Sequence, residues 1–418
     1  MKKKPKGKTQ QQIRQEQVHQ KRLYLQKIRS VMGIIGSESA FDLLSPSEVD
    51  TLYLARLRPF KLKSGTYNGH TISDADMKVI NYYLNDALKT TFVNIGPDET
   101  KVSHYDFCTY VDTIYLVWRN ASSLPLANAE KFVEKFPVFM NDFQNKRSEI
   151  LTQIERHLEH AGWLFSDVVN NVAWVGREDK PHSCLGLDNS QSYNTYLVHF
   201  SPPETEVLDI DGNKRSIFRV GIGTLNGIDW LSVTPEELGV HGVLEKLPLK
   251  VFIQKHAVDR VKERLGDVLA ASIFFLVAGA VLDKDACNAD GGNFLLACWY
   301  MSLKIGYFKA DIIGDKLLIR TFLFLTNNGT PEGKKLASII GVQKEDKKYL
   351  GIDKLSTFVN SDIEQDGNLK AIFCQAGCGD LFKIKKHLSE DKDHSMHCAD
   401  YFTKYLGLRK EKGVTMME

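Results

Sequence analysis

The chain has 418 residues, of which 43% are hydrophobic and 25% are charged, and this length predicts two or three domains. The composition is that of a globular protein and excludes a fibrous or wholly disordered chain. Seven scattered cysteines are too few, and odd in number, for a disulfide framework, so we expect a reducing, cytoplasmic setting.

Positive charge is concentrated at the N-terminus. Residues 1–30 contain ten basic side chains and one acid, Glu16, a balance of +9 that leaves −7 for the rest of the chain. A basic arm on a mildly acidic body is typical of proteins that grip phosphate backbones, although a solubilising tail has the same composition. The candidate nucleic-acid-binding residues are Lys2, Lys3, Lys4, Lys6, Lys8, Arg14, Lys21 and Arg22. No apolar segment follows the arm as it would in a secretory signal.

Residues 1–10 are predicted to be disordered, and residues 11–165 to form a mostly helical domain. Apolar residues recur there at helical spacing, and strand signals are few. Ser45 begins the sequence Ser-Pro-Ser-Glu, which is a helix start signal, and Ser73 is a second predicted cap.

Residues 166–250 are predicted to be rich in β-structure. β-Branched and aromatic residues predict four strands, with a hairpin turn at "DGN" between the last two, at 172–176, 193–200, 205–210 and 214–223. Residues 331–418 are predicted to be mixed and mainly helical, beginning with a helix capped by Thr330 and opened by Pro331.

Residues 251–330 are predicted to form a module of two helices followed by strands. The helices are expected at 254–265 and 267–282, and the strands at 294–301, 304–313 and 317–326. The apolar run 268–282 has 15 residues, whereas a membrane span needs roughly 20, so we expect a buried helix and no membrane. The predicted class is α+β: a mostly helical N-terminal domain followed by a mixed domain with antiparallel sheets.

The segment "FIQKHAVDRVKERLG", residues 252–266, carries a row of three basic residues at four-residue intervals. Its apolar residues Ala257, Val258, Val261 and Leu265 cluster on one arc of a helix, so the row faces away from the core. One interpretation is a solvated face, with Arg260 paired to Glu263 and Arg264 to Asp267. The other is a phosphodiester site, because guanidinium groups bind phosphate oxygens bidentately and imidazole titrates near neutral pH. The row consists of His256, Arg260 and Arg264.

The pattern His-Ala-x-x-Arg-x-x-Glu-Arg at 256–264 resembles the opening helix of small toxin-like domains related to RelE and barnase-type ribonucleases. In those domains the helix is followed by another helix and an antiparallel sheet, the same order as is expected at 251–330. The resemblance covers about a fifth of the chain. It implies metal-independent RNA cleavage with His256 as general acid or base and Arg260 and Arg264 on the phosphate. The strand near Arg320 offers no side chain that aligns with a definite catalytic partner.

Other combinations of residues point less clearly to chemistry. Cys374 and Cys378 have a spacing that zinc ligands use, but chance clustering is the favoured interpretation, and no metal or cofactor is predicted. His157 and His160 are interpreted as surface residues of a helix. The glycines of "RVGIGTLNG" do not have dinucleotide-binding spacing.

Two classes of function are consistent with these features. The first is a nucleic-acid-directed enzyme, an endoribonuclease that favours RNA. The second is a non-catalytic nucleic-acid-binding or assembly protein that uses the toxin-like module as a scaffold, with a protein partner left open. The distinguishing feature is whether His256 lies in a cleft with basic or hydroxyl groups opposite it.

Overall fold

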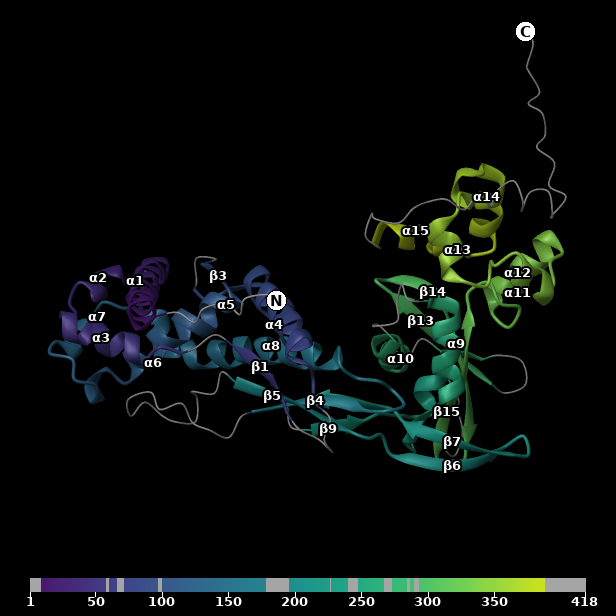
Figure 1. Ribbon diagram of the computed structural model, residues 1–418, viewed down its shortest axis with the longest axis horizontal. Helices are drawn as coiled ribbons and strands as arrows, with labels where there is room; N and C mark the ends of the chain where they lie inside the picture. The colour runs from purple at the N-terminus through teal and green to yellow at the C-terminus, as the bar shows by residue number, and fades with distance from the viewer. Residues whose placement is uncertain are drawn as a thin grey trace, which may run out of the picture. The chain divides into compact units, whose positions relative to one another are not determined.

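The protein is described by a computed structural model and belongs to the α+β class, as predicted (Figure 1). The structure describes residues 9–57, 60–65, 71–96, 100–177, 195–225, 227–239, 247–266, 273–283, 286–288 and 293–387. Of the predicted disordered arm, residues 1–10, only residues 9 and 10 fall within these ranges. The lysines at positions 2, 3, 4, 6 and 8 all lie outside them. The chain forms two compact units: unit 1 comprises 1–162, 174–200 and 224–227, and unit 2 comprises 163–173, 201–223 and 228–418.

Unit 1 is mainly helical. Its longest helices are α1 (Gln10–Ile35), α4 (Asp74–Thr90) and α8 (Phe143–Trp163). Its shorter helices are α2 (Glu38–Phe41), α3 (Pro46–Leu54), α5 (His104–Asp106), the π-helix η1 (Phe107–Val111), α6 (Asp112–Arg119), η2 (Ala121–Ser123), α7 (Ala129–Glu134) and η3 (Val138–Asp142). Its strands are β1 (Lys61–Ser64), β2 (Phe92–Asn94), β3 (Lys101–Ser103), β4 (Val172–Arg177) and β5 (Thr195–Ser201), with β1, β5 and β4 in one sheet.

The predicted helix starts in unit 1 are confirmed. The Ser45 hydroxyl accepts a hydrogen bond from the backbone N–H of Glu48, and the Glu48 carboxylate accepts one from the backbone N–H of Ser45. Pro46 occupies the first helical position of α3. Ser73 caps α4 in the same way by accepting from Asp76.

The C-terminal half of α1 packs into the core of unit 1, and several of its basic residues form ion pairs. Lys21 pairs with Asp50, Lys27 with Asp106 at 3.0 Å, and Arg29 with Asp42 at 2.9 Å. Arg14 and Arg22 are exposed on the same helix. The positive charge of this segment is therefore partly neutralised by unit 1 itself. Its buried residues are Tyr24, Ile28, Val31, Met32 and Ile35.

His104 and His157 of unit 1 contact each other. His157 is therefore half-buried against a second histidine and is not the simple surface residue that the sequence predicts. Nδ1 of His104 lies 3.2 Å from Nε2 of His157, and His104 is 1% exposed. Burial lowers the pKa of both imidazoles, and also that of His160 one helical turn beyond His157. One ring nitrogen of the pair must accept, so the contact requires at least one neutral imidazole.

We predict that this pair makes unit 1 sensitive to mild acid. In the unfolded chain the histidines titrate near pH 6.5, whereas the folded pKa values are lower, so the unfolded state binds more protons between those values. The stabilisation is complete above about pH 6.5 and is lost as the pH falls towards the lowered folded pKa. The measurement is the difference in melting temperature between pH 7.5 and pH 5.5. His157→Gln should reduce that difference, and the exposed His19→Gln should leave it unchanged; an equal difference in both variants would contradict the prediction.

Unit 2 is built on a mixed sheet whose strand order is β12-β13-β14-β15-β11-β7-β6, with β10 pairing β11. Its strands are β6 (Thr205–Ile210), β7 (Asn213–Arg219), β10 (Ser232–Val233), β11 (Leu249–Gln254), β12 (Ala286–Asn288), β13 (Phe294–Tyr300), β14 (Leu303–Ile313) and β15 (Lys316–Phe324). A separate two-stranded sheet consists of β8 (Gly221–Thr224) and β9 (Gly227–Trp230). The strand predictions near 205–210, 294–301, 304–313 and 317–326 are confirmed.

Unit 2 also contains helices, most of which follow the strands in the chain (Figure 1). The two in the toxin-like module are α9 (Lys255–Leu265) and α10 (Ile273–Leu282). The others are η5 (Glu236–Leu238), α11 (Pro331–Ile340), α12 (Lys344–Tyr349), α13 (Leu355–Asn360), η8 (Ile363–Gln365), α14 (Gly367–Gln375), α15 (Asp380–Lys383) and η9 (Ile384–His387). The Thr330 cap and Pro331 at the start of α11 are as predicted. Helix α10 is buried, and within the described ranges no helix has the length and hydropathy needed to cross a membrane.

Strand β11 lies in the middle of the sheet and is covered on both faces. It pairs antiparallel with β7 and parallel with β15. Val251 and Ile253 point into the large core with Ala257, Val258, Val261 and Leu265 of α9. Phe252 points the other way, into a small cluster with Ile210, Ile217 and Leu318. The alternation of side chains along a strand therefore defines two faces of the sheet: the α9 face and the opposite face.

Candidate active site

A polar pocket of about 380 Å³ lies in unit 2 at the start of α9. Basic, hydroxyl and amide side chains surround it, together with one carboxylate and the imidazole of His256. We call it the His256 pocket. Its lining residues are Asp211, Arg215, Gln254, His256, Lys309, Arg320 and Thr321.

The pocket lies on the sheet face opposite α9. Gln254 pairs directly with Ile217, a member of the small cluster on that face, and Arg215 is two residues from Ile217 on β7. Side chains two residues apart on a strand share a face, as do directly paired residues of adjacent strands. His256 follows Gln254 by two residues, in the first turn of α9, and so reaches the pocket from the end of β11.

A β-bulge places two consecutive residues of β15 at the pocket. Lys309 pairs with Thr321, but Ala310 pairs with Ile319, so Arg320 has no partner residue on β14. In a regular strand Arg320 and Thr321 would point to opposite faces, whereas a bulge changes the direction of a side chain and often occurs next to active sites. The bulge thus adds a guanidinium and a hydroxyl to the same pocket as Lys309.

Two aspartates hold Arg320. Its guanidinium donates to Asp311 at 2.9 Å and also to Asp211, which lies in the hairpin turn between β6 and β7. These hydrogen bonds raise the pKa of Arg320 above its usual range, and the bond to Asp311 has the larger effect. Asp211 and Gly212 both have positive φ (55° and 75°), as the two-residue turn predicted at "DGN" requires. The pocket's positive charge therefore comes mainly from Arg215 and Lys309, with Arg320 fixed in orientation by its partners.

Gln254 is the buried polar group of the pocket. It is 6% exposed, and its Nε2 has no hydrogen-bond partner among the described residues. A buried amide N–H without an acceptor costs about 1–3 kcal/mol. The same residue precedes α9, whose N-terminus has no side-chain cap. An anion in the pocket would give this donor an acceptor and would lie next to the positive end of the helix dipole.

The structure separates the three residues of the predicted row. His256 is exposed and lines the pocket, and Nε of Arg260 approaches its Nε2 at 3.5 Å, while Arg260 also pairs with Glu263 as expected. Arg264 is different: its side chain is 15% exposed and pairs with Asp353 of unit 2. Arg264 is therefore half-buried and not on a fully solvated face, and its expected partner Asp267 lies outside the described residues. Burial lowers the pKa of Arg264, which lines a different cavity with Lys347 and Asp353.

The described residues contain no group of histidines, cysteines and acids arranged to hold a metal ion. Cys374 is exposed, whereas Cys378 is buried and its thiol pKa is raised to about 12 by burial. The side chain of His387, and residues His394, His397 and Cys398, lie outside the described residues.

Sequence reasoning missed most of the pocket. Arg215, Gln254 and Lys309 belong to strands or a strand end, and no short motif joins them. One signal was available: Gln254 and Lys309 are polar residues in mostly apolar strands, at positions where the alternation predicts burial. Only the pairing of β11, β14 and β15 shows that these positions converge.

Comparisons with protein-family models, with curated proteins and with solved structures found no significant match to this chain.

We predict that Gln254→Leu raises the stability of the ligand-free protein and lowers its affinity for ligand. Leucine has a similar size and removes the unpartnered donor, so the melting temperature of the ligand-free protein should rise. Affinity for a phosphate-containing ligand should fall, because the donor that faces the anion is lost. Thermal denaturation and an RNA-binding titration measure the two effects, with Gln365→Leu as an exposed control that should change neither. A lower melting temperature together with unchanged binding would show that Nε2 has a structural role.

Proposed function

We propose that this protein is an endoribonuclease that cleaves RNA phosphodiesters at the His256 pocket without a metal ion. One observation carries the proposal: His256 lines a pocket together with Arg215, Lys309 and Thr321, which are the basic and hydroxyl groups that the reaction needs. An imidazole suits proton transfer near neutral pH, and cations beside it suit the negative charge that grows on phosphorus.

The reaction follows from the nucleophile that RNA itself carries. The 2′-oxygen attacks the adjacent phosphorus while its proton passes to Nε2 of His256, which releases the 3.5 Å hydrogen bond from Nε of Arg260 as it becomes protonated. The bond from phosphorus to the 5′-oxygen breaks, and the departing oxygen takes a proton from water, which the exposed position of His256 admits. The products are a 2′,3′-cyclic phosphate and a 5′-hydroxyl, and His256 returns its proton to solvent. Lys309 and Arg215 would stabilise the added charge on the phosphorane.

Arg260 has a positioning role in this scheme. Its Nε faces Nε2 of His256 at 3.5 Å, and its guanidinium is held by Glu263. Arg264 has no direct role, because it is paired with Asp353 and lines another cavity. The resemblance of 256–264 to RelE and barnase-type domains supports the reaction class. It does not supply the phosphate contacts, which come instead from strands β7, β14 and β15.

The alternative function is non-catalytic nucleic-acid binding. Its favouring observation is that Asp211 is a carboxylate within the pocket and pairs with Arg320, so part of the local positive charge is already neutralised. Such a site could hold a backbone phosphate without the charge needed to accelerate cleavage.

We predict that His256→Ala abolishes cleavage while leaving folding and binding nearly intact. A general acid–base group contributes on the order of 10²–10⁴ in rate, and an exposed substitution changes stability by about 0.5 kcal/mol or less. The measurement is a time course on labelled RNA with EDTA present, with the product termini identified as cyclic phosphate or not. His19→Ala, an exposed histidine of unit 1, is the matched control.

Three outcomes would contradict the catalytic proposal. They are RNA that stays intact with the wild type, equal rates for wild type and His256→Ala, or cleavage of an oligonucleotide whose 2′-hydroxyls are all methylated. Intact RNA with retained, salt-sensitive binding at the pocket would favour the non-catalytic alternative.

We predict that the pocket cations set the salt dependence of RNA binding. Lys309→Ala and Arg215→Ala should each weaken binding and reduce the slope of log K against log salt by about 0.7, the value for one contact to a single-stranded phosphate. Lys214→Ala is the matched control, because Lys214 is the exposed neighbour of Arg215 on β7 and points to the other face. Equal slopes in all three variants would place the RNA backbone elsewhere.

A further inference from the structure

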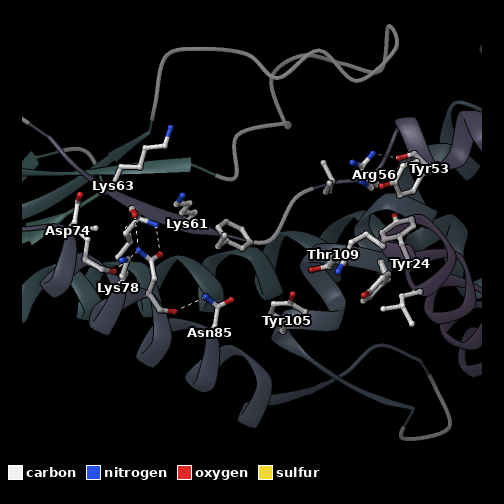
Figure 2. A pocket seen from close by; sticks show the side chains of 18 of the residues that line it. Tyr24, Tyr53, Arg56, Lys61, Lys63, Asp74, Lys78, Asn85, Tyr105 and Thr109 are labelled. Carbon is white, nitrogen blue, oxygen red and sulfur yellow. Dashed lines mark hydrogen bonds between the residues drawn. The ribbon is translucent and has the colours of Figure 1, made fainter. Parts of the chain in front are cut away.

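Unit 1 contains a larger groove, of about 1150 Å³, that the His256 chemistry does not use. Figure 2 shows Lys61, Lys63 and Lys78 at one end and Tyr53 and Arg56 at the other. The volume exceeds the roughly 300–1,000 Å³ of pockets for drug-sized molecules, so the groove fits an extended ligand. We call it the unit 1 groove.

Aromatic rings form one end and the middle of the groove. Tyr24 contacts Tyr53 and Tyr110, with ring centroids 5.6 and 5.3 Å apart, and Tyr105 lies further along (Figure 2). The guanidinium of Arg56 lies 3.7 Å from the Tyr53 ring centroid and donates to the Tyr53 carbonyl at 2.7 Å. Tyrosine rings and a stacked guanidinium are surfaces on which nucleic-acid bases stack.

Cations form the other end, on β1 and α4. Lys61 and Lys63 are exposed on β1, with Leu62 buried between them, and Lys78 is exposed on α4. Within the described part of the chain neither Lys61 nor Lys78 forms an ion pair, and the groove's lining holds four cations against one carboxylate, Asp74. The β1–α4 end of the groove is therefore positively charged.

The side-chain amide of Asn81 holds β1 in place at the lysine end of the groove. The side chain of Asn81 accepts a hydrogen bond from the backbone N–H of Leu62 and donates one to its carbonyl, both at 2.9 Å. Asn81 thus pairs with β1 as a neighbouring strand would. The lysines on either side of Leu62 are held on a rigid strand, which favours binding of a charged ligand at a defined position.

The floor of the groove carries a buried hydroxyl without a partner. Thr109 lines the groove (Figure 2), is 4% exposed, and its Oγ1 has no hydrogen-bond partner among the described residues. It lies in the π-helix η1, an element that occurs frequently at functional sites. A polar group of a ligand, such as a base edge or a ribose hydroxyl, would satisfy it.

We propose that the unit 1 groove binds single-stranded nucleic acid, with bases stacked on Tyr105 and on the Arg56 guanidinium that covers Tyr53, and backbone phosphates on Lys61, Lys63 and Lys78. A single strand carries phosphates next to aromatic bases, and the groove carries cations next to tyrosines, so the two are chemically complementary. The volume of the groove is large enough for two or more nucleotides. The choice of RNA over DNA rests on the proposed function, whereas the groove's affinity for a single strand does not.

The experiment measures binding of a fluorescein-labelled ten-nucleotide DNA to the full chain by fluorescence anisotropy. DNA lacks the 2′-hydroxyl and cannot be cleaved by the proposed reaction, so failure of binding and failure of cleavage are distinguishable. The double variant Lys61→Ala, Lys78→Ala should weaken binding about ten-fold and reduce the salt slope by about 1.4, the value for two single-strand phosphate contacts. Tyr105→Leu should weaken binding roughly ten-fold or more, and Tyr105→Phe should retain it, because stacking needs the ring and not the hydroxyl.

The matched control is Lys131→Ala, Lys135→Ala, which removes an exposed lysine of α7 and the exposed lysine directly after that helix, both outside the groove, and should bind as the wild type does. Circular dichroism confirms that each variant is folded. The proposal is overturned if wild type does not bind the strand, if folded groove variants bind it normally, or if the control loses as much affinity as they do. It is also overturned if adenosine monophosphate binds at the groove while the ten-nucleotide strand does not, since the groove would then hold a small molecule. Loss of RNA cleavage in His256→Ala with unchanged DNA binding would leave this proposal intact.

Discussion

The position of β11 is the constraint on which the His256 pocket depends. This strand is buried on both faces and paired on both edges, so its register is set by packing as well as by hydrogen bonds. A shift of one residue would turn Phe252 into the large core and Gln254 away from the pocket. Because α9 begins directly after Gln254, the same register also sets where His256 lies. The backbone of His256 therefore follows directly from a strand of unit 2 that is buried on both faces and paired on both edges.

The ion pairs of Arg320 fix the direction of its guanidinium, and they also neutralise part of the positive charge of the His256 pocket. A guanidinium between Asp211 and Asp311 keeps its fork in one direction, which favours bidentate contact with a phosphate. The two carboxylates also repel that phosphate. Asp211 lies in a turn and its side chain is 74% exposed, whereas Asp311 is 17% exposed, so a bound anion would displace the contact to Asp211 more easily. The electrostatics therefore depend on the β6–β7 turn, which the sequence pattern "DGN" specifies.

The local parts of this fold could be predicted from the sequence, and the long-range parts could not. Periodicity gave the buried arc of α9, and cap chemistry gave the starts of α3, α4 and α11, because both depend on neighbouring residues. The short strand β1 was missed because four residues carry little periodic signal. Of the site, His256 was predicted, but the partners of Arg264 and the cations that line the His256 pocket, Arg215 and Lys309, were not. Asp353 is 89 residues from Arg264, and the bulge at Arg320 depends on how β14 pairs with β15.

Buried polar groups without partners indicate binding sites only in the right surroundings. Nε1 of Trp118 is also buried and has no hydrogen-bond partner in the described part of the chain, yet Trp118 lines neither the His256 pocket nor the unit 1 groove. Gln254 and Thr109 differ because each belongs to the lining of a cavity that also holds cations. In each case a ligand with oxygen or nitrogen acceptors and negative charge would supply what the protein lacks, and the energy of leaving those groups unpaired would be recovered on binding. Nucleic acid has both properties along its whole length, so the two proposals name the same class of ligand for two cavities built from different elements.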